Sequence, residues 1–415
     1  MITIIKNIAE IVQVERTIRS WVAGQDMSQI ETIKNGFIEI DNGIISNFGS
    51  MESWKGIEDW NNTEIIDANG GMVFPTYCDS HTHIVFFGNR EKEWVQRING
   101  ASYTEIANSG GGIINSAKQL QNSSESSLLE SALVRINEVI SMGTGALEIK
   151  SGYGLSVDAE LKMLNVIKQL KDHTPIPIKS TFLGAHAIPE KYQGNSSKYL
   201  DVIINEMLPI ISQEKLADYI DIFCEEGYFS VNDTERLLSA ASEYGLLPKT
   251  HVNQFTILGG VRKSIEHKAL SVDHLELMNE DDFDALQHSE CMPTLLPGCS
   301  FFLGIPYGPA RQLIDKGLPV ALASDYNPGS SPSGNMSFVA SLGCIKMNMT
   351  PEEVINATTI NTAYAMGLSH QVGSIALGKK ANLFITKPIS SYAFLAYSFG
   401  HQNIDKILIN GKIQS

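Results

Sequence analysis

The sequence has few cysteines, and this shortage excludes two classes of small fold. Its five cysteines are odd in number and scattered without C-x-x-C spacing; they are Cys78, Cys224, Cys291, Cys299 and Cys344. Such a pattern argues against a disulfide framework and against a zinc ribbon. We interpret them as small buried thiols of a protein in a reducing compartment.

The sequence is also short of basic charge. Lys and Arg number 31 against 46 Asp and Glu, which gives a formal net charge of -15. A sequence-independent grip on phosphate backbones depends on clustered Lys and Arg, so we expect no nucleic acid partner.

Long apolar runs are missing too. No run approaches the roughly 20 residues that a membrane-spanning helix needs, and the first residues lack the basic start and apolar core of a signal peptide. The hydrophobic content of 43% and charged content of 19% are typical of globular proteins. We therefore expect a cytoplasmic protein with no membrane partner.

Both ends of the chain have β-type patterns. Residues 36–40 and 44–48 alternate in polarity around Asn42-Gly43, a strong signal for a hairpin. Residues 381–386 and 406–413 repeat this style. We expect residues 1–72 and 366–415 to pair as one small, discontinuous β domain.

Between these ends, short apolar runs alternate with helical patterns. Residues 145–150 precede a helical pattern over 157–170, and residues 176–182 form the next apolar run. Alternation of this kind over 73–365 predicts an α/β fold with a parallel sheet, and a closed (β/α)8 barrel fits the length.

Polar residues follow the predicted barrel strands. His81 and His83 follow the first, and later strands are followed by His186, His251, His274 and Asp325. The carboxyl ends of barrel strands all face one mouth, so we expect these side chains to meet there.

The pair His81 and His83 has two interpretations. Residues at i and i+2 of a strand share a face, so both rings could bind one ion; for the motif alone, two hydrogen-bonded histidines are the favoured interpretation. With His251 and Asp325 at their own strand ends, a set of three nitrogens and one oxygen becomes the better interpretation, and this set suits a divalent ion such as zinc.

A series of motifs carries a family resemblance. They are Pro75-x-x-x-Asp79-x-His81-x-His83, Gly88-Asn89-Arg90, Gly110-Gly111-Gly112-Ile113, Glu148 to Leu155, Phe182 to Pro189, Asp273-His274-Leu275-Glu276 and Asp325 to Ser330. The metal motif, the later histidines and Ser324-Asp325 resemble the amidohydrolase superfamily. The combination resembles its imidazolonepropionase family of histidine degradation.

This resemblance implies a TIM-like (β/α)8 hydrolase barrel with a small β-sandwich domain from both termini. It implies hydrolysis of the cyclic amide of 4-imidazolone-5-propanoate to N-formimidoyl-L-glutamate, with one zinc or iron ion per chain. The implied metal ligands are His81, His83, His251 and Asp325. The residues implied around the substrate are Arg90, Tyr153, His186, Gln254, Asn327, Gly329 and Ser330.

For the mechanism, we expect Asp325 to carry a proton, with His274 as its partner or co-base, and His186 to help stabilise the oxyanion. Gln254 stands where some relatives have Glu, and an amide cannot take a proton from water. Arg90 could bind the propanoate carboxylate in a bidentate manner, or could simply pair with Glu91 or Glu93. Tyr153 could donate to the substrate or only pack on its loop.

Other interpretations remain open. A related aminohydrolase would act on a neutral purine or pyrimidine, a catalytically dead relative would serve only in binding, and a two-metal enzyme would use a carboxylated Lys150 or Lys179. The glycines at 110–112 lack the Lys-Ser/Thr of a phosphate loop and suggest a flexible loop at the mouth or a turn into a helix near Ile113. We assign no role to the remaining histidines, and we expect a homodimer because homodimers are common among soluble enzymes.

Overall fold

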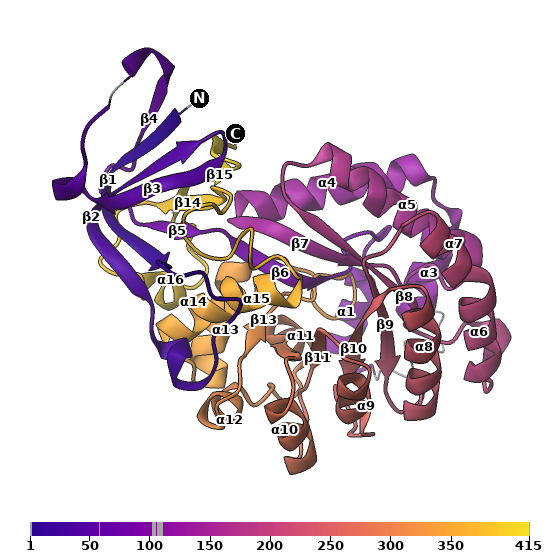
Figure 1. The fold of residues 1–415 in the computed structure, drawn as a ribbon. Helices are drawn as coiled ribbons and strands as arrows, with labels where there is room; N and C mark the ends of the chain where they lie inside the picture. The colour runs from indigo at the N-terminus through magenta and orange to yellow at the C-terminus, as the bar shows by residue number, and fades with distance from the viewer. Residues whose placement is uncertain (1, 58, 102–104, 106–110, 415) are drawn as a thin grey trace.

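The computed structural model describes residues 2–57, 59–101, 105 and 111–414. Two sheets of eight strands each organise the chain, one built from its middle and one from its two ends (Figure 1). The first forms the barrel and the second lies beside it, with both termini near its upper end in this view.

The barrel sheet contains parallel strands in the order of the sequence, each followed by helical segments. Its strands are β6 (Tyr77–Thr82), β7 (Thr144–Lys150), β8 (Ile178–Ala185), β9 (Tyr219–Cys224), β10 (Leu247–Val252), β11 (Ser271–His274), β12 (Met292–Leu295) and β13 (Ala321–Leu322). All but the ends of these strands are buried, because helices cover the outer face and side chains fill the inside.

The barrel closes through backbone contacts just beyond β13. The amide of Asp325 donates to the carbonyl oxygen of His81 (2.9 Å), and the amide of His83 donates to that of Tyr326 (2.9 Å). The strand expected before Asp325 is regular only over Ala321–Leu322, yet the chain still pairs with β6 where the predicted ligands lie.

Helices form the outer layer of the barrel. They are α1 (Glu91–Ile98), α3 (Gly112–Asn122), α4 (Glu125–Ser141), α5 (Val157–His173), α6 (Ser196–Val202), α7 (Leu208–Gln213), α8 (Val231–Glu243), α9 (Gly260–Glu266), α10 (Glu280–Gln287), α11 (Pro297–Leu303), α12 (Ala310–Asp315), α13 (Met336–Met347), α14 (Pro351–Thr358) and α15 (Ile360–Ala365). The helix predicted over 157–170 is confirmed as α5, and the turn into a helix near Ile113 as the start of α3. Gly110 lies outside the described residues.

The sheet of the termini contains β1 (Ile2–Val14), β2 (Glu31–Asp41), β3 (Ile44–Ser50), β4 (Thr63–Asp67), β5 (Val73–Pro75), β14 (Leu383–Thr386), β15 (Ile404–Ile409) and β16 (Lys412–Ile413). Strand β5 pairs with both β1 and β14 and so joins the two ends of the chain. The hairpin at Asn42-Gly43 is confirmed as β2 and β3. This curled sheet encloses its own apolar core, which includes Ile5, Ile38 and Leu408, as expected for the small β-sandwich domain. The domain boundaries at 72 and 365 stay a prediction.

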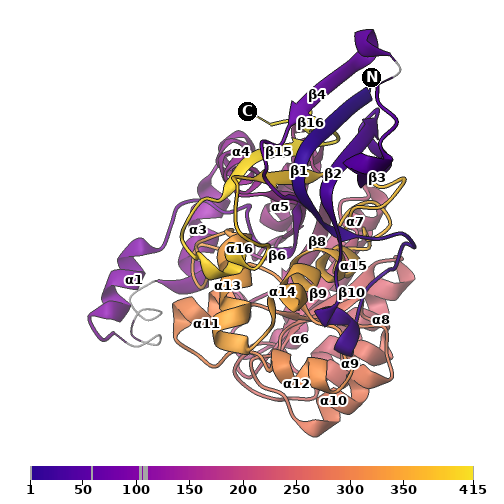
Figure 2. The ribbon, with the colours of Figure 1, turned by 90° about the vertical axis from the view of Figure 1, so that its left-hand side faces the viewer.

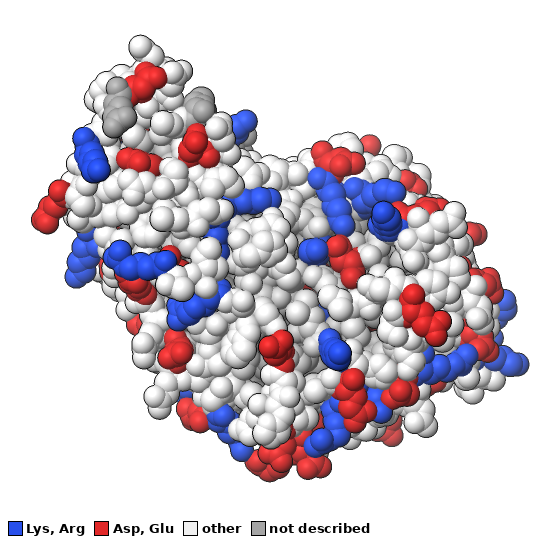
Figure 3. All heavy atoms as spheres, viewed as in Figure 1, with Lys and Arg blue, Asp and Glu red and all other residues white. Residues whose placement is uncertain are grey.

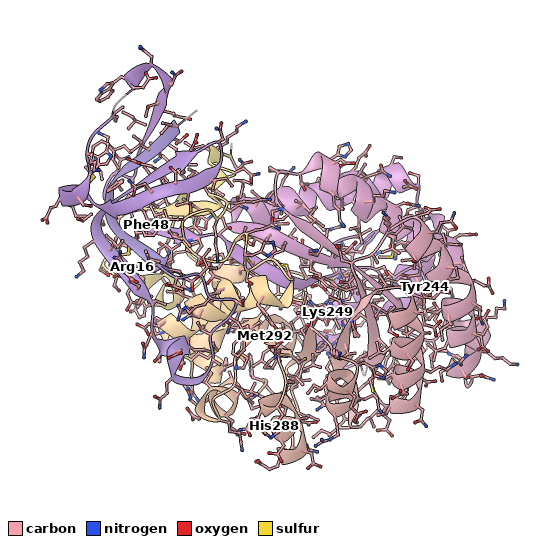
Figure 4. All side chains as sticks on the ribbon, viewed as in Figure 1. Arg16, Phe48, Tyr244, Lys249, His288 and Met292 are labelled. Carbon is pink, nitrogen blue, oxygen red and sulfur yellow. The ribbon has the colours of Figure 1, made fainter. Side chains whose placement is uncertain are left out.

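The labelled side chains distinguish the interior of the barrel from its outer edge. Lys249 lies within the barrel, whereas His288 lies at its outer edge beyond α10 (Figure 4). On the face drawn in Figure 3, basic and acidic groups are interspersed, without a continuous basic patch. None of the helices among the described residues is long and apolar enough to cross a membrane.

Candidate active site

Four side chains at strand ends form the predicted metal site. His81 and His83 flank the end of β6, while Thr82 between them turns to β7 and donates its hydroxyl to the carbonyl oxygen of Glu148 (2.6 Å). Nitrogens of His81, His83 and His251 all lie within 4.8 Å of one another. Asp325 Oδ1 lies 3.6 Å from Nε2 of both His81 and His83.

This arrangement fits a single divalent ion. Among the described residues, Nε2 of His81 and Nε2 of His251 are buried without a hydrogen-bond partner. Ligand atoms of a tetrahedral ion with bonds near 2.0 to 2.1 Å lie about 3.4 Å apart, close to the observed 3.6 Å. Buried nitrogens that lack a partner in such a cluster have the geometry of ligands.

Two buried carboxylates fix the orientation of the histidines. Nδ1 of His81 lies 2.6 Å from Asp273 Oδ2, and Nδ1 of His251 lies 3.0 Å from Asp221 Oδ2. Each carboxylate accepts the Nδ1 proton, so the lone pair of Nε2 points to the cluster. Asp221 was not singled out from the sequence and Asp273 was named there only within a motif, although each is a charged residue within a buried apolar strand.

The imidazoles of His81 and His83 favour the neutral form that binds metal. Burial lowers the pKa of His81 well below its ordinary value, and the positive charge of Lys150 adds to this effect. Burial and the neighbouring His186 likewise lower the pKa of His83. Metal binding requires neutral imidazole, so protons compete little at neutral pH.

Lys150 lies beneath the cluster in a buried ionic network. Its Nζ lies 2.9 Å from Glu148 Oε1, 2.8 Å from Asp221 Oδ2 and 3.4 Å from Asp273 Oδ2. Burial alone would lower the pKa of Lys150, but these three carboxylates outweigh it and raise the pKa above its ordinary value.

This network argues against a carboxylated lysine. The charged ammonium of Lys150 has no lone pair to take up carbon dioxide. Lys179 lies near the amino end of β8, away from the mouth, and pairs with Asp218 at 3.1 Å. The geometry therefore favours the single-ion interpretation.

Asp325 and His274 adopt unusual backbone conformations. Their φ angles are +55° and +86°, in a region that side-chain-bearing residues rarely enter. His274 Nδ1 lies 3.3 Å from Glu276 Oε1. Burial opposes protonation of His274, but Glu276 outweighs it and raises the pKa of the ring.

A small cavity opens over this cluster. Its lining residues are His83, Tyr153, His186, Phe223, His251, Gln254, His274, Asp325, Asn327 and Ser330. The structure thus brings together side chains from widely separated strand ends, as the sequence analysis predicted. Phe223 is a lining residue that the sequence analysis missed.

His186 stands on the wall of the cavity, stacked on His83 with ring centroids 5.1 Å apart. Its Nδ1 lies 3.1 Å from the carbonyl oxygen of Gly152, which can only accept, so the proton resides on Nδ1. Burial, with His251, lowers the pKa of His186 to about 3. The ring therefore offers a lone pair at Nε2 and cannot donate from there to an oxyanion.

A buried glutamate holds the loop that carries Tyr153. The Glu160 carboxylate accepts backbone hydrogen bonds from Gly152 (3.1 Å), Gly154 (2.7 Å) and Leu155 (3.1 Å). The Tyr153 ring lies against His83 and His186, at centroid distances of 5.9 and 5.5 Å. The sequence analysis missed Glu160 because an acid in the first turn of a helix normally needs no further explanation.

Arg90 reaches the turn that follows Asp325. A Cβ on Gly329 would lie 2.1 Å from Arg90 Nη1, so the guanidinium packs directly on this glycine. Arg90 also forms the ion pair that the sequence suggested, with Nε 2.7 Å from Glu93 Oε2. Because Nε is used, the Nη atoms are the ones available to a ligand.

The turn itself is built around Asn327. Its Oδ1 accepts the backbone amides of Gly329 and Ser330, both at 2.8 Å, and its Nδ2 donates to the carbonyl oxygen of Asp325 (2.6 Å). Gln254 lies nearby and donates to Cys299 Sγ at 3.4 Å.

The other histidines lie elsewhere. His173, His288, His370 and His401 are exposed, and His267 pairs with Glu235 at 3.1 Å.

Comparison with known proteins shows the family of the chain. A profile of the amidohydrolase family matches residues 72–414. The chain is 58% identical to imidazolonepropionase of Flavobacterium johnsoniae and 56% identical to imidazolonepropionase of Christiangramia forsetii, over 100% of each chain. Guanine deaminase of E. coli has the same fold, with a TM-score of 0.74 over 100% of this chain and 99% of that one, at 13% identity.

Proposed function

The chain belongs to the amidohydrolase family and, within it, to the imidazolonepropionases, and from this premise we propose how its residues carry out the reaction. The reaction is hydrolysis of the cyclic amide of 4-imidazolone-5-propanoate to N-formimidoyl-L-glutamate in histidine degradation. A divalent metal ion serves as cofactor. Our proposal concerns the metal ligands, the substrate contacts and the proton path.

His81, His83, His251 and Asp325 would hold the ion, which is zinc or iron. When bound, such an ion supplies an activated water near neutral pH and polarises the carbonyl that is attacked. Two observations carry this assignment: Nε2 of His81 and of His251 are buried without a hydrogen-bond partner among the described residues, and Asp325 Oδ1 lies 3.6 Å from Nε2 of both His81 and His83.

Asp325 would take the proton from the attacking water and pass it to the ring nitrogen that leaves. Burial raises the pKa of Asp325 above its ordinary value, while His274 and His251 counteract this effect, as a bound cation also would. His274 lies beside it and would share the proton. Gln254, an amide, would only position the substrate.

Arg90 would bind the propanoate group. The Nη atoms make no hydrogen bond to the described residues, so they could make charge-assisted hydrogen bonds to a carboxylate, and Tyr153 would add a hydroxyl donor. A neutral purine or pyrimidine would offer these Nη atoms no anionic group, and Glu93 would remain the counter-ion of Arg90. Asn327 and Ser330 would complete the contact from the turn.

The role of His186 differs from the one that the sequence suggested. Since its Nδ1 proton is held by Gly152, its Nε2 would accept a hydrogen bond from a substrate N–H instead of donating to the oxyanion. This contact would orient the cyclic amide for attack.

The deciding experiment combines metal analysis with an activity assay. We expect about one ion per chain and hydrolysis of 4-imidazolone-5-propanoate by the purified protein. Asp325→Asn should abolish measurable turnover. The expected loss is a factor of about 100 or more, because general acid–base catalysis contributes on that scale. An Asp325→Asn protein with bound metal and near-normal turnover would refute the proton path.

We also propose a cytoplasmic homodimer that binds neither nucleic acid nor membrane. Helix α1 projects from the body of the protein in Figure 2, and its Trp94, Val95 and Ile98 are 45%, 49% and 63% exposed. An apolar face on a projecting helix supports contact with a second subunit. Sedimentation equilibrium would report a monomer if this proposal is wrong.

A further inference from the structure

A second group of potential ligands lies beside the predicted metal site. His274, Glu276 and Cys299 each place a ligand atom within 4.8 Å of the other two. His274 and Glu276 lie at and just beyond the end of β11, and Cys299 lies in the first turn of α11. All three residues are buried, at 3%, 5% and 0% exposed.

One oxygen in this group lacks a partner. Glu276 Oε1 contacts His274 Nδ1 and accepts from the Ser300 hydroxyl, both at 3.3 Å. Glu276 Oε2 has no hydrogen-bond partner among the described residues, although the side chain is only 1% exposed. A buried carboxylate oxygen left unpaired is costly, and a cation would remove that cost.

The donor types indicate which cation would bind. A thiolate, an imidazole and a carboxylate together favour borderline or soft divalent ions such as zinc and cadmium over magnesium or calcium. The sulfur accepts a hydrogen bond from Gln254 Nε2 at 3.4 Å, and the thiol also hydrogen-bonds with the side chains of Asp325 and Ser330, so an ion bound here would replace these contacts. Ion binding would displace the thiol proton to solvent.

We propose that His274, Glu276 and Cys299 form a second cation site, which takes a zinc-class ion when that metal is in excess. An ion in this site occupies His274 and thereby inhibits hydrolysis. The inhibition rests on the role proposed for His274 in catalysis, whereas the binding site itself rests only on the three ligands.

Binding can be tested without an activity assay. The full chain is first loaded with one equivalent of zinc and then titrated with cadmium, while thiolate-to-metal charge-transfer absorption and bound metal per chain are measured. We expect a second equivalent to bind with a charge-transfer band. Cys299→Ser should remove the band and weaken binding of the second ion by about tenfold or more.

Two further variants identify the ligands. Glu276→Gln should weaken binding of the second ion while leaving the Cys299 thiolate available. Cys291→Ser removes another buried thiol and should leave the charge-transfer band unchanged. A single bound ion without a band would overturn the proposal. A band that survives in Cys299→Ser would also overturn it, because the thiolate would then be another cysteine.

The inhibitory effect is measured as the ratio of turnover with and without excess zinc. This ratio should fall in the wild type and stay near one in Cys299→Ser; equal inhibition of both would refute inhibition through this site. If the zinc-loaded protein did not hydrolyse 4-imidazolone-5-propanoate at all, the proposed reaction would fail, while stoichiometry and absorption would still decide whether the second site exists.

Discussion

Replacing Lys150 by Met tests whether a buried charge network holds the metal ligands in place. The ammonium of Lys150 lies between Glu148, Asp221 and Asp273, and all four side chains are 0% exposed. Methionine has a similar length and no charge. The substitution therefore removes the cation with little change in packing volume.

The expected loss of stability follows from the carboxylates that remain buried after the ammonium of Lys150 is removed. Lys249 still contacts Glu148, but Asp221 and Asp273 keep only the hydrogen bonds of their histidines and neighbouring groups. Removing one partner of a buried ionic network typically costs about 3–5 kcal/mol, and no solvent screens this site. We expect the free energy of unfolding to fall by this amount.

The Lys150→Met substitution should also lower the affinity for the metal ion. Asp221 and Asp273 orient His251 and His81, and disturbance of such supporting carboxylates typically lowers metal affinity by about 10- to 100-fold. The assay is urea unfolding of metal-free and metal-loaded protein, combined with competition against a chelator. Because a bound ion stabilises the folded state by mass action, the loaded Lys150→Met protein should regain less stability on metal addition than the wild type.

Lys179→Met is the matched control. Lys179 is a 26% exposed lysine of the neighbouring strand, paired with Asp218 at 3.1 Å. An ion pair near the surface is worth about 0–1 kcal/mol and should leave metal affinity unchanged. If Lys150→Met matched this control in both measurements, the buried ammonium would not balance the carboxylates, and the argument would fail.

Three other predictions concern the loops and the lower end of the barrel. Gly329→Ala should displace the Arg90 guanidinium and, like Arg90→Ala, raise KM for 4-imidazolone-5-propanoate by about tenfold or more with a smaller change in kcat; equal kinetics for wild type and Gly329→Ala would contradict the packing argument. Glu160→Gln turns an amide N–H toward backbone donors, so it should cost about 1–3 kcal/mol in urea unfolding and raise KM, whereas exposed Asp158→Asn on the same helix should do neither. Burial opposes ionisation of Asp218, but hydrogen bonds and ion pairs from Ser180, Lys171 and Lys179 outweigh it and lower the pKa of Asp218 below 3.8. Asp218→Asn should therefore be less stable than the wild type at pH 7, and the difference in unfolding free energy should shrink as pH falls through that lowered pKa. A difference that stayed constant with pH would show that the ionised carboxylate is not its cause.

The fold was largely predictable because its sequence signals are local. Alternating polarity around Asn42-Gly43 identifies a hairpin, and apolar runs between helical patterns identify the parallel strands. The last barrel strand was harder to delimit. Only Ala321–Leu322 form a regular strand, and closure continues through single backbone contacts of Asp325 and Tyr326 with the opposite edge. Such contacts depend on the curvature of the whole barrel, which no local pattern records.

The candidate site was predictable only in part, for a similar reason. His81, His251 and Asp325 stand out because a polar residue follows each apolar strand. Asp221 supports His251 from the neighbouring strand β9, Asp273 supports His81 from the non-adjacent strand β11, and Glu160 supports the Tyr153 loop from a helix face. Their sequence contexts indicate burial or a helix start, and their partners become visible only once strand and loop are placed together.

The structure separates the support of the ion from the support of the substrate. The residues proposed to bind the ion are fixed by barrel closure, since the backbone of Asp325 pairs with that of His81 where their side chains converge. Two of the groups proposed to bind substrate stand on loops held by an acid: Glu93 pairs with Arg90, and Glu160 holds the loop of Tyr153. Changes in the Lys150 network should therefore appear as lost stability and metal affinity, and changes in the loop acids as raised KM with the metal retained. Because the two supports share no side chain, a double variant from both groups should combine their effects additively.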